Sequence, residues 1–257
     1  MDLQLTGKVG IVTGASRGVG RAIAQALAAE GMRLTLVARS EDPLEELSRS
    51  LPQPSLIQAL DLRQPDVPDA VVRATIERFG HLDLLVNNAG ATVRGDFLNL
   101  TDLEWGDGFA LKLFGAMRCC RAAWKHLQAT GGSIVNIVGI GGRTGSAEFA
   151  IGGSVNAALL NLTKVLADRG VADGVRVNAI NPGAIVTDRL QIRIRRLATD
   201  QGIDEASAMA ELAREMKIAR FGKPAEIGSI VAFLASHHAD YCQGAILDVD
   251  GGQTRTL

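Results

Sequence analysis

Short apolar runs alternate with longer segments of helical periodicity along most of the chain. Seven runs have the length and composition of buried strands: 8–14, 32–38, 55–61, 82–88, 133–139, 175–180 and 245–250. The segments between them place apolar residues on one helical face, as in 20–31, where Gly31 is a helix stop. Strands that alternate with helices imply right-handed crossovers and a sheet covered on both faces. The pattern therefore predicts an α/β protein with a doubly wound, seven-stranded parallel sheet.

The chain is predicted to form a single domain over residues 1–257. No Pro-, Gly- or Ser-rich linker divides it, and a length of 257 residues suits one large α/β domain. The longest interruption of the alternating pattern is 188–222, which is charged and helical in character. We expect this segment to be a mobile substrate flap inserted before the last helix and strand.

Composition and charge narrow the functional classes. The chain is 47% hydrophobic and 21% charged, which argues against disorder, and its net charge of −1 gives no reason to expect nucleic acid or an anionic membrane as partner. Its three cysteines, Cys119, Cys120 and Cys242, suit a reducing compartment better than a disulfide framework. The first residues lack the apolar core of a secretory signal, and the apolar runs are too short to span a bilayer. We expect a cytoplasmic protein with no nucleic-acid or membrane partner.

The stretch TGASRGVG, residues 13–20, has the features of a phosphate-binding loop. It follows the first predicted strand and begins the first predicted helix. Gly14 permits a tight turn, while Gly18 and Gly20 let the backbone approach a pyrophosphate at the positive end of the helix. Three glycines in a turn are weak evidence alone, but this context predicts dinucleotide binding.

The end of the second predicted strand selects the dinucleotide. An acidic residue there would accept hydrogen bonds from the ribose hydroxyls of NAD, but this chain has Arg39. Arg39 and Arg17 can reach a 2′-phosphate, so NADP(H) is favoured over NAD(H). In the alternative interpretation Arg39 is a solvated strand end, Ser40 caps a helix that starts near Pro43, and the acidic pair 41–42 lies close by.

Several motifs together resemble the short-chain dehydrogenase/reductase family, in its single-domain branch. They are TGASRGVG (13–20), ALDLR (59–63), NNAG (87–90), GSIVNIVG (132–139), NPGAIVTD (181–188) and the segment 220–252. The resemblance covers essentially the whole chain, and the order and spacing of the motifs make it specific. It implies a Rossmann-like fold, an oxidoreductase activity, and a homotetramer packed through the long helices and the C-terminal strand.

The resemblance also implies a set of cofactor-binding positions. Asp61 and Leu62 would flank the adenine and 88–90 would line the ribose. Gly183, Ile185 and Thr187 would meet the nicotinamide. The full set is Gly14, Ser16, Arg17, Gly18, Val19, Gly20, Arg39, Asp61, Leu62, Asn88, Ala89, Gly90, Pro182, Gly183, Ile185 and Thr187.

The catalytic positions implied by the resemblance depart from the family pattern. Family members use an Asn-Ser-Tyr-Lys set, in which the tyrosine is the acid/base and the lysine lowers its pKa. The corresponding residues here are Lys112, Gly139, Gly152 and Asn156. A shifted alignment does not rescue the tyrosine, because the only one, Tyr241, lies in the connection to the last strand. We therefore expect that the usual proton relay cannot operate.

Two residues are candidates for a different chemistry. The family's Asn and Lys appear in exchanged positions as Lys112 and Asn156, and the two glycines are expected to enlarge the pocket. Lys112 in a partly apolar pocket could act as base or nucleophile; in the alternative it extends from its helix to solvent. Glu148 could be a replacement acid/base or an exposed loop charge.

Other polar residues carry less weight. The run RIRR, 193–196, is either the solvated face of the flap helix or a grip on an anionic substrate. No metal site is predicted, because the four histidines do not cluster. These are His81, His126, His237 and His238.

Three functional hypotheses follow. The protein binds a cofactor without catalysis, as a regulatory member or as the silent subunit of a hetero-oligomer with an active homologue. Alternatively it is an enzyme, a lyase, isomerase or atypical carbonyl reductase, that uses Lys112 or Glu148. Slow carbonyl reduction by cofactor and water alone is the weakest mechanistically, because positioned acid–base groups supply about 10²–10⁴-fold. Non-catalytic or non-standard activity is favoured, and the substrate is not specified by the sequence.

Overall fold

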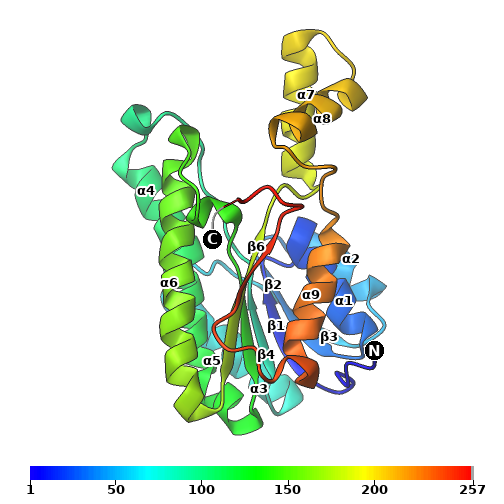
Figure 1. Ribbon diagram of the computed structural model, residues 1–257. Coiled ribbons are helices and arrows are strands. Elements are labelled where there is room, and N and C mark those ends of the chain that lie inside the picture. Colours follow the sequence, from blue (N-terminus) through cyan, green and yellow to red (C-terminus); the bar gives the residue numbers. More distant parts are fainter. Residues whose placement is uncertain (256–257) are drawn as a thin grey trace.

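The computed structural model describes residues 1–255, which contain one seven-stranded parallel sheet (Figure 1). The strand order is β3-β2-β1-β4-β5-β6-β7. The strands are β1 (Val9–Thr13), β2 (Arg33–Ala38), β3 (Ser55–Ala59), β4 (Leu84–Asn87), β5 (Ser133–Ile137), β6 (Arg176–Pro182) and β7 (Ile246–Val249). Each predicted run contains or overlaps one strand, and β6 continues two residues beyond its run, to Pro182. The predicted doubly wound α/β fold is confirmed.

Helices cover both faces of the sheet and create two cores. α1, α2 and α9 pack on one face with Ile23, Leu44 and Val231 in its core; α3 and α5 pack on the other, around Val71 and Leu127. The helices are α1 (Gly18–Ala29), α2 (Glu41–Ser50), α3 (Val67–Phe79), α4 (Asp102–Phe109), α5 (Ala116–Thr130), α6 (Ala150–Asp173), α7 (Asp188–Gln201), α8 (Glu205–Glu215) and α9 (Pro224–Ala235). A π-helical segment, η2 (Ala110–Gly115), joins α4 to α5.

The chain reverses its winding direction between β1 and β4. After β1 the strands β2 and β3 extend the sheet to one side, and β4 then pairs with the free side of β1. The loops after these two strands separate at the carboxyl edge of the sheet, and this switch point is where open α/β sheets bind ligands.

The helical stretch Ala147–Asp173 is long and apolar enough to cross a membrane by length and composition. Most of it is α6, which lies along the sheet beside β6. Ile151, Val155 and Leu159 on this helix are buried in the protein. Packing on the sheet accounts for these residues, while 33% of the apolar window as a whole is buried and Val165 and Val171 are exposed.

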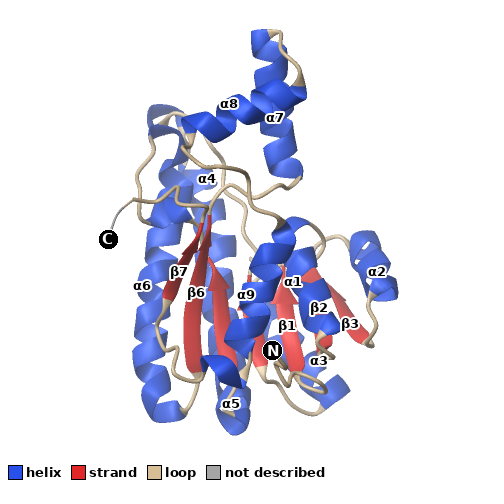
Figure 2. Ribbon diagram, turned by 45° about the vertical axis from the view of Figure 1, so that its right-hand side comes forward, coloured by secondary structure: helices blue, strands red, loops and turns tan. Residues whose placement is uncertain are grey.

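The flap predicted at 188–222 is helical, as expected. It consists of α7 and α8, which stand beyond the carboxyl edge of the sheet (Figure 2). They have a small core of their own, which includes Leu190, Ile194, Leu212 and Phe221. The flap is thus a distinct packed unit above the switch point, and its mobility stays a prediction.

Candidate dinucleotide and substrate site

The loop between β1 and α1 has the geometry that its glycines predict. Gly14 and Gly18 have left-handed backbone, with φ of 66° and 55°. A Cβ at Gly20 would lie 2.2 Å from the Gly14 carbonyl oxygen, so only glycine fits there. The loop leads directly into the N-terminus of α1, where free backbone N–H groups favour an anion.

Asn88 fastens this loop to the end of β4. Its Nδ2 donates hydrogen bonds to the carbonyl oxygens of Thr13 (3.0 Å) and Gly14 (3.1 Å). In return the buried Thr13 hydroxyl accepts from the backbone N–H groups of Asn88 (2.9 Å) and Ala89 (3.0 Å). Thr13 is not among the site residues predicted from the sequence. It is the first residue of the glycine motif TGASRGVG, and this position is the signal that could have identified it.

Asp61 lies just beyond the end of β3, held by Arg63. The carboxylate accepts from Arg63 Nη2 at 2.7 Å and from its Nε at 3.0 Å. This hydrogen bonding lowers the pKa of Asp61, and the charge of Arg39 acts in the same direction. Leu62 is buried beside it. The predicted adenine end therefore combines a fixed carboxylate with an apolar residue.

The two arginines expected at the 2′-phosphate are both exposed. Arg17 is the N-cap residue of α1, and Arg39 follows directly after β2. α2 begins at Glu41, earlier than the alternative start near Pro43, and the Ser40 side chain makes no capping hydrogen bond. Ser40 is thus at the N-cap position without performing the bonding role that the alternative gave it.

The predicted nicotinamide end lies between the end of β6 and the start of α7. A Cβ at Gly183 would lie 2.6 Å from Asp250 Cβ, which leaves no room for a side chain. Ile185 forms a β-bridge with Gly222 at the base of the flap. A Cβ at Gly18 would lie 3.3 Å from Thr187 Cγ2. Thr187 therefore reaches the phosphate loop, and the structure brings the two ends of the predicted cofactor site together.

Gly139 and Asn156 are neighbours behind the carboxyl end of β5. Gly139 has φ of 130°, and its N–H donates to Asn181 Oδ1 at 3.2 Å. A Cβ at Gly139 would lie 3.2 Å from Asn156 Nδ2. Asn156 is 3% exposed and its Oδ1 has no partner within residues 1–255. An unsatisfied buried amide oxygen of this kind is costly, which marks the position as one where a polar group is expected to bind.

Phe149 fills the space beside Gly152. A Cβ at Gly152 would lie 2.1 Å from the Phe149 ring, and one at Gly141 would lie 2.8 Å from it. The expectation that two glycines enlarge the pocket is therefore wrong at Gly152, because the ring of a residue three positions earlier takes the volume. Phe149 can be read from the sequence, but the direction of its ring cannot, because the turn before α6 determines where the ring points.

Arg94 covers the outer face of the same ring. Its guanidinium carbon lies 4.0 Å from the Phe149 ring centroid, a cation–π distance. The two loops are tied by a hydrogen bond from the Gly95 N–H to the Glu148 carbonyl oxygen (3.1 Å). Burial lowers the pKa of Arg94, as do the charges of Arg193 and Arg189, while Glu148 opposes them. Glu148 itself is exposed, which agrees with the interpretation as a loop charge.

Lys112 points into the site from η2. Its stem crosses Gly90, where a Cβ would lie 2.9 Å from Lys112 Cδ, and its Nζ donates to the Val138 carbonyl oxygen. Desolvation, followed by the charge of Arg189, lowers the pKa of Lys112 to about 7. The alternative in which Lys112 extends to solvent is wrong. The ammonium instead lies at the peptide that precedes Gly139.

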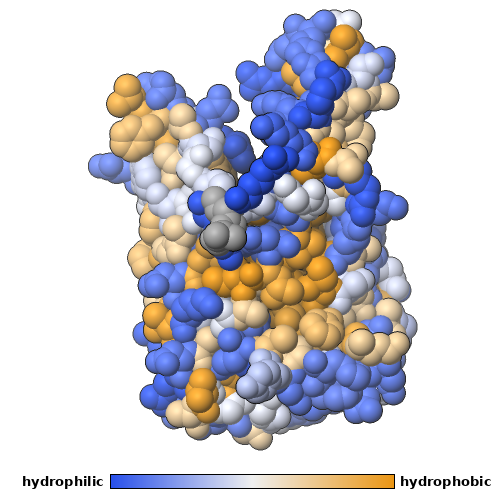
Figure 3. Space-filling model, in the orientation of Figure 1, coloured by the Kyte–Doolittle hydropathy of each residue, from blue (hydrophilic) through white to orange (hydrophobic). Residues whose placement is uncertain are grey.

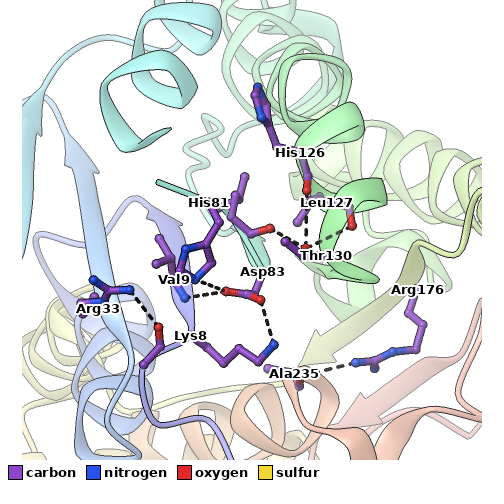
Figure 4. A network of polar contacts seen from close by, with 12 residues as sticks. Lys8, Val9, Arg33, His81, Asp83, His126, Leu127, Thr130, Arg176 and Ala235 are labelled. Atoms are coloured by element: carbon purple, nitrogen blue, oxygen red, sulfur yellow. Dashed lines mark hydrogen bonds and ion pairs between the residues drawn. The ribbon is translucent and has the colours of Figure 1, made fainter. Parts of the chain in front are cut away.

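The opposite, amino edge of the sheet has a cavity of about 210 Å³ lined by charged residues. Figure 4 shows that these charges are used within the protein. Asp83 pairs with Lys8 at 2.9 Å and His81 at 3.2 Å, and Arg176 donates to the Leu234 carbonyl oxygen at 2.8 Å. No group of three or more metal-ligating side chains occurs within residues 1–255. This cavity is therefore a structural junction rather than a second candidate site.

Fold and site together define a dinucleotide-binding α/β protein. Residues 14–254 match the family described as enoyl-(acyl carrier protein) reductase. The chain belongs to the short-chain dehydrogenase/reductase family of oxidoreductases.

Relatives resemble the chain over nearly its full length. It is 35% identical over 251 residues to 3-oxoacyl-(acyl-carrier-protein) reductase FabG of Vibrio cholerae, covering 97% of this chain and 98% of that protein. The short-chain reductase protein NovJ of Streptomyces niveus is 34% identical over 251 residues, covering 95% and 93%. L-sorbose reductase from Gluconobacter frateurii, solved with NADPH and L-sorbose, superposes with a TM-score of 0.96 at 35% identity, covering 100% of both chains.

Proposed function

We propose that this protein is an NADP(H)-binding member of its family that does not use the family's tyrosine-based proton relay. By family correspondence the four catalytic positions hold Lys112, Gly139, Gly152 and Asn156. The observation that carries the proposal is the Phe149 ring against Gly152, because it occupies the space into which a side chain at that position would project. Neither glycine nor phenylalanine can donate the proton that carbonyl reduction requires.

The residues at the carboxyl edge suit a dinucleotide. Gly14 forms a left-handed turn, and the missing side chains at Gly20 and Gly183 let neighbouring segments of the chain pack closely around the edge where a dinucleotide would lie. Arg17 and Arg39 are exposed, at the start of α1 and directly after β2, and their guanidinium groups suit a 2′-phosphate, which supports NADP(H) over NAD(H). The related L-sorbose reductase was solved with NADPH. When bound, the nicotinamide would supply or accept a hydride.

A second candidate function gives Lys112 a direct role in an enzyme. Its ammonium lies beside the peptide before Gly139, and its pKa of about 7 makes it a proton donor near neutral pH. In this function Lys112 protonates a carbonyl oxygen of the substrate as hydride arrives, which is an atypical carbonyl reduction. A lyase or isomerase would use the neutral amine as a base instead. Exposed Glu148 is less well placed for either role.

The cofactor proposal is tested by calorimetric titration with NADPH and NADH. We expect NADPH to bind about tenfold or more tightly than NADH, because Arg39 forms a charge-assisted contact with the 2′-phosphate. Arg39→Gln should weaken NADPH and leave NADH unchanged. Arg49→Gln is the matched control, because Arg49 lies on α2 and pairs with Glu45. Equal affinities would overturn the NADP(H) preference, and no binding of either would overturn the cofactor function.

The role of Lys112 is tested by NADPH oxidation with a panel of ketones, in the wild type and in Lys112→Met. A non-catalytic protein shows no oxidation above background in either. If Lys112 is the acid, the wild-type rate is constant below pH 7 and falls as pH rises above it, because the deprotonated amine cannot donate. Lys112→Met should then lose about 10²-fold or more of the rate. Turnover that survives in Lys112→Met would exclude this mechanism.

We also propose a cytoplasmic homotetramer, or a hetero-oligomer with an active homologue. Within residues 1–255, β7 pairs with β6 alone and forms one edge of the sheet. Figure 3 shows apolar surface gathered on the face that contains this edge. An unpaired edge beside apolar surface favours contact with another subunit. Light scattering on the purified protein measures the subunit number, and co-purification would reveal an active partner.

A further inference from the structure

We propose that the space between the flap and the body binds an anionic group, a carboxylate or phosphate of the substrate or ligand, through Arg94, Lys112, Arg189 and Arg193. This cation cluster, defined by those four residues, comes from the loop after β4, from η2 and from α7. The inference rests on the proposed function, because the cluster lies over the predicted nicotinamide end. It adds the chemical class of the second ligand.

The body side of the space carries two of the cations at fixed positions. The guanidinium carbon of Arg94 lies 4.0 Å from the Phe149 ring centroid, and Lys112 is held by the Val138 carbonyl oxygen. Both anchors are uncharged, so neither neutralises the positive charge. Arg94 therefore retains its charge for a ligand, Lys112 carries its charge below its pKa of about 7, and both side chains are already ordered.

The flap side supplies the other two cations. Arg189 and Arg193 are four residues apart on α7, so they lie on one side of that helix. The field of Arg189 acts on both Arg94 and Lys112, and that of Arg193 acts on Arg94. In the space-filling view of Figure 3 a hollow separates the flap from the body. The guanidinium groups of the flap thus act across this hollow on the cations of the body.

The RIRR run of the flap holds two further arginines. Arg195 and Arg196 have carboxylates at 3.8 Å and 3.6 Å within the flap. Within residues 1–255, Arg94, Lys112 and Arg189 form no ion pair within 4.0 Å, and Arg193 has only exposed Glu215 at 3.9 Å. Pairing alone does not separate the three arginines, because each has one exposed carboxylate of the flap at 3.6 to 3.9 Å. Arg193 is assigned to the cation cluster because it lies four residues after Arg189 and its charge acts on Arg94.

The charges of the cation cluster indicate which class of ligand it binds. Like charges held together cost free energy, and a bound anion removes that cost at all of them at once. Guanidinium forks match carboxylate and phosphate oxygens in pairs. A neutral sugar or ketone gains nothing from this arrangement. The ligand should therefore carry its anionic group within reach of both Arg94 and Arg189.

The test is calorimetric titration of the full-length protein, saturated with NADP⁺, using malonate and methyl phosphate as anionic probes and malonamide as the neutral control. We expect saturable binding of at least one anion and none of malonamide. Arg94→Gln and Arg189→Gln should each weaken anion binding about tenfold. Arg196→Gln, on the same helix and paired within the flap, should bind as the wild type does. Binding of malonate but not of methyl phosphate would indicate a carboxylate ligand, and the reverse result would indicate a phosphate ligand.

Three results would overturn the inference. Neither anion binds, or binding is unchanged in both Arg94→Gln and Arg189→Gln, or anion binding occurs without NADP⁺ and disappears when NADP⁺ is added. The last result would assign the cluster to the cofactor's own phosphates. Failure of the proposed function looks different, because NADPH alone would then not bind.

Discussion

The amino edge of the sheet and the part of the carboxyl edge that faces the flap use charge in different ways. At the amino edge, the Asp83 carboxylate pairs with Lys8 and His81 and accepts a hydrogen bond from the Val9 N–H (Figure 4). Arg176 donates hydrogen bonds to carbonyl oxygens at the end of a helix. At the carboxyl edge, the four residues of the cation cluster have almost no partners of opposite charge within residues 1–255. The first arrangement stabilises the junction of strands and loops. The second costs stability at Lys112, where burial lowers the pKa of the ammonium, and it leaves the exposed arginines free for the anion proposed above.

Charged side chains that have no partner in the folded protein point to a binding site. Buried or crowded charges in a folded protein are normally paired, because an unpaired one is costly. The position of the unpaired cations at the switch point agrees with the place where doubly wound sheets bind ligands.

The largest effect is expected from removing the central acceptor of the amino edge. Asp83→Ala removes the acceptor that lies 2.8 Å from the buried Val9 N–H. It also leaves Lys8 and His81 without their ion-pair partner. We expect a loss of about 2–4 kcal/mol in the free energy of unfolding, measured by urea denaturation, with NADPH affinity unchanged.

Asp107→Ala is the matched control at the carboxyl edge. Asp107 is exposed and touches Arg63 at 3.3 Å, so its removal should cost less than about 1 kcal/mol. Equal losses in the two variants would contradict the view that the amino edge is the structural one.

Much of the fold follows from the sequence for a simple reason. Strand and helix periods are local, so the seven apolar runs and the glycines at 14, 18 and 20 can be read without knowing the rest of the chain. The flap's helices were predicted on the same basis. Parallel order of the strands then places the loops after β1, β4 and β6 at one edge, which is enough to predict a cofactor site there.

The contents of the catalytic space did not follow from the sequence. Phe149 covers Gly152 because of the direction of one side chain at a turn, and no periodic pattern encodes that direction. Whether Lys112 points inward depends on the π-helical segment, which the sequence analysis did not predict. The assignment of Arg193 to the cation cluster likewise depends on how α7 is turned toward the body. These are tertiary properties, set by packing between segments distant in sequence.

The same substitution at the two edges should have opposite signs. Lys8→Met removes a salt bridge with Asp83 and should lower the free energy of unfolding by about 0.2–1 kcal/mol, since Lys8 is half exposed. Lys112→Met removes an amine whose pKa falls from 10.5 to about 7 on folding. Below pH 7 the wild type pays for charging this amine in the folded state, so Lys112→Met should be the more stable protein there, by about 1–2 kcal/mol.

The pH dependence separates this electrostatic effect from a gain in packing. Between pH 7 and 10.5 the unfolded chain holds a proton on Lys112 that the folded protein does not. Wild-type stability therefore rises with pH in this window, by at most about 1.4 kcal/mol per pH unit, and the advantage of Lys112→Met disappears. Urea denaturation at pH 6 and pH 9 measures both variants against the wild type. If Lys112→Met is more stable than the wild type by the same amount at both pH values, the folded protein does not lower the pKa of Lys112. The contrast between the edges would then depend on the arginines alone.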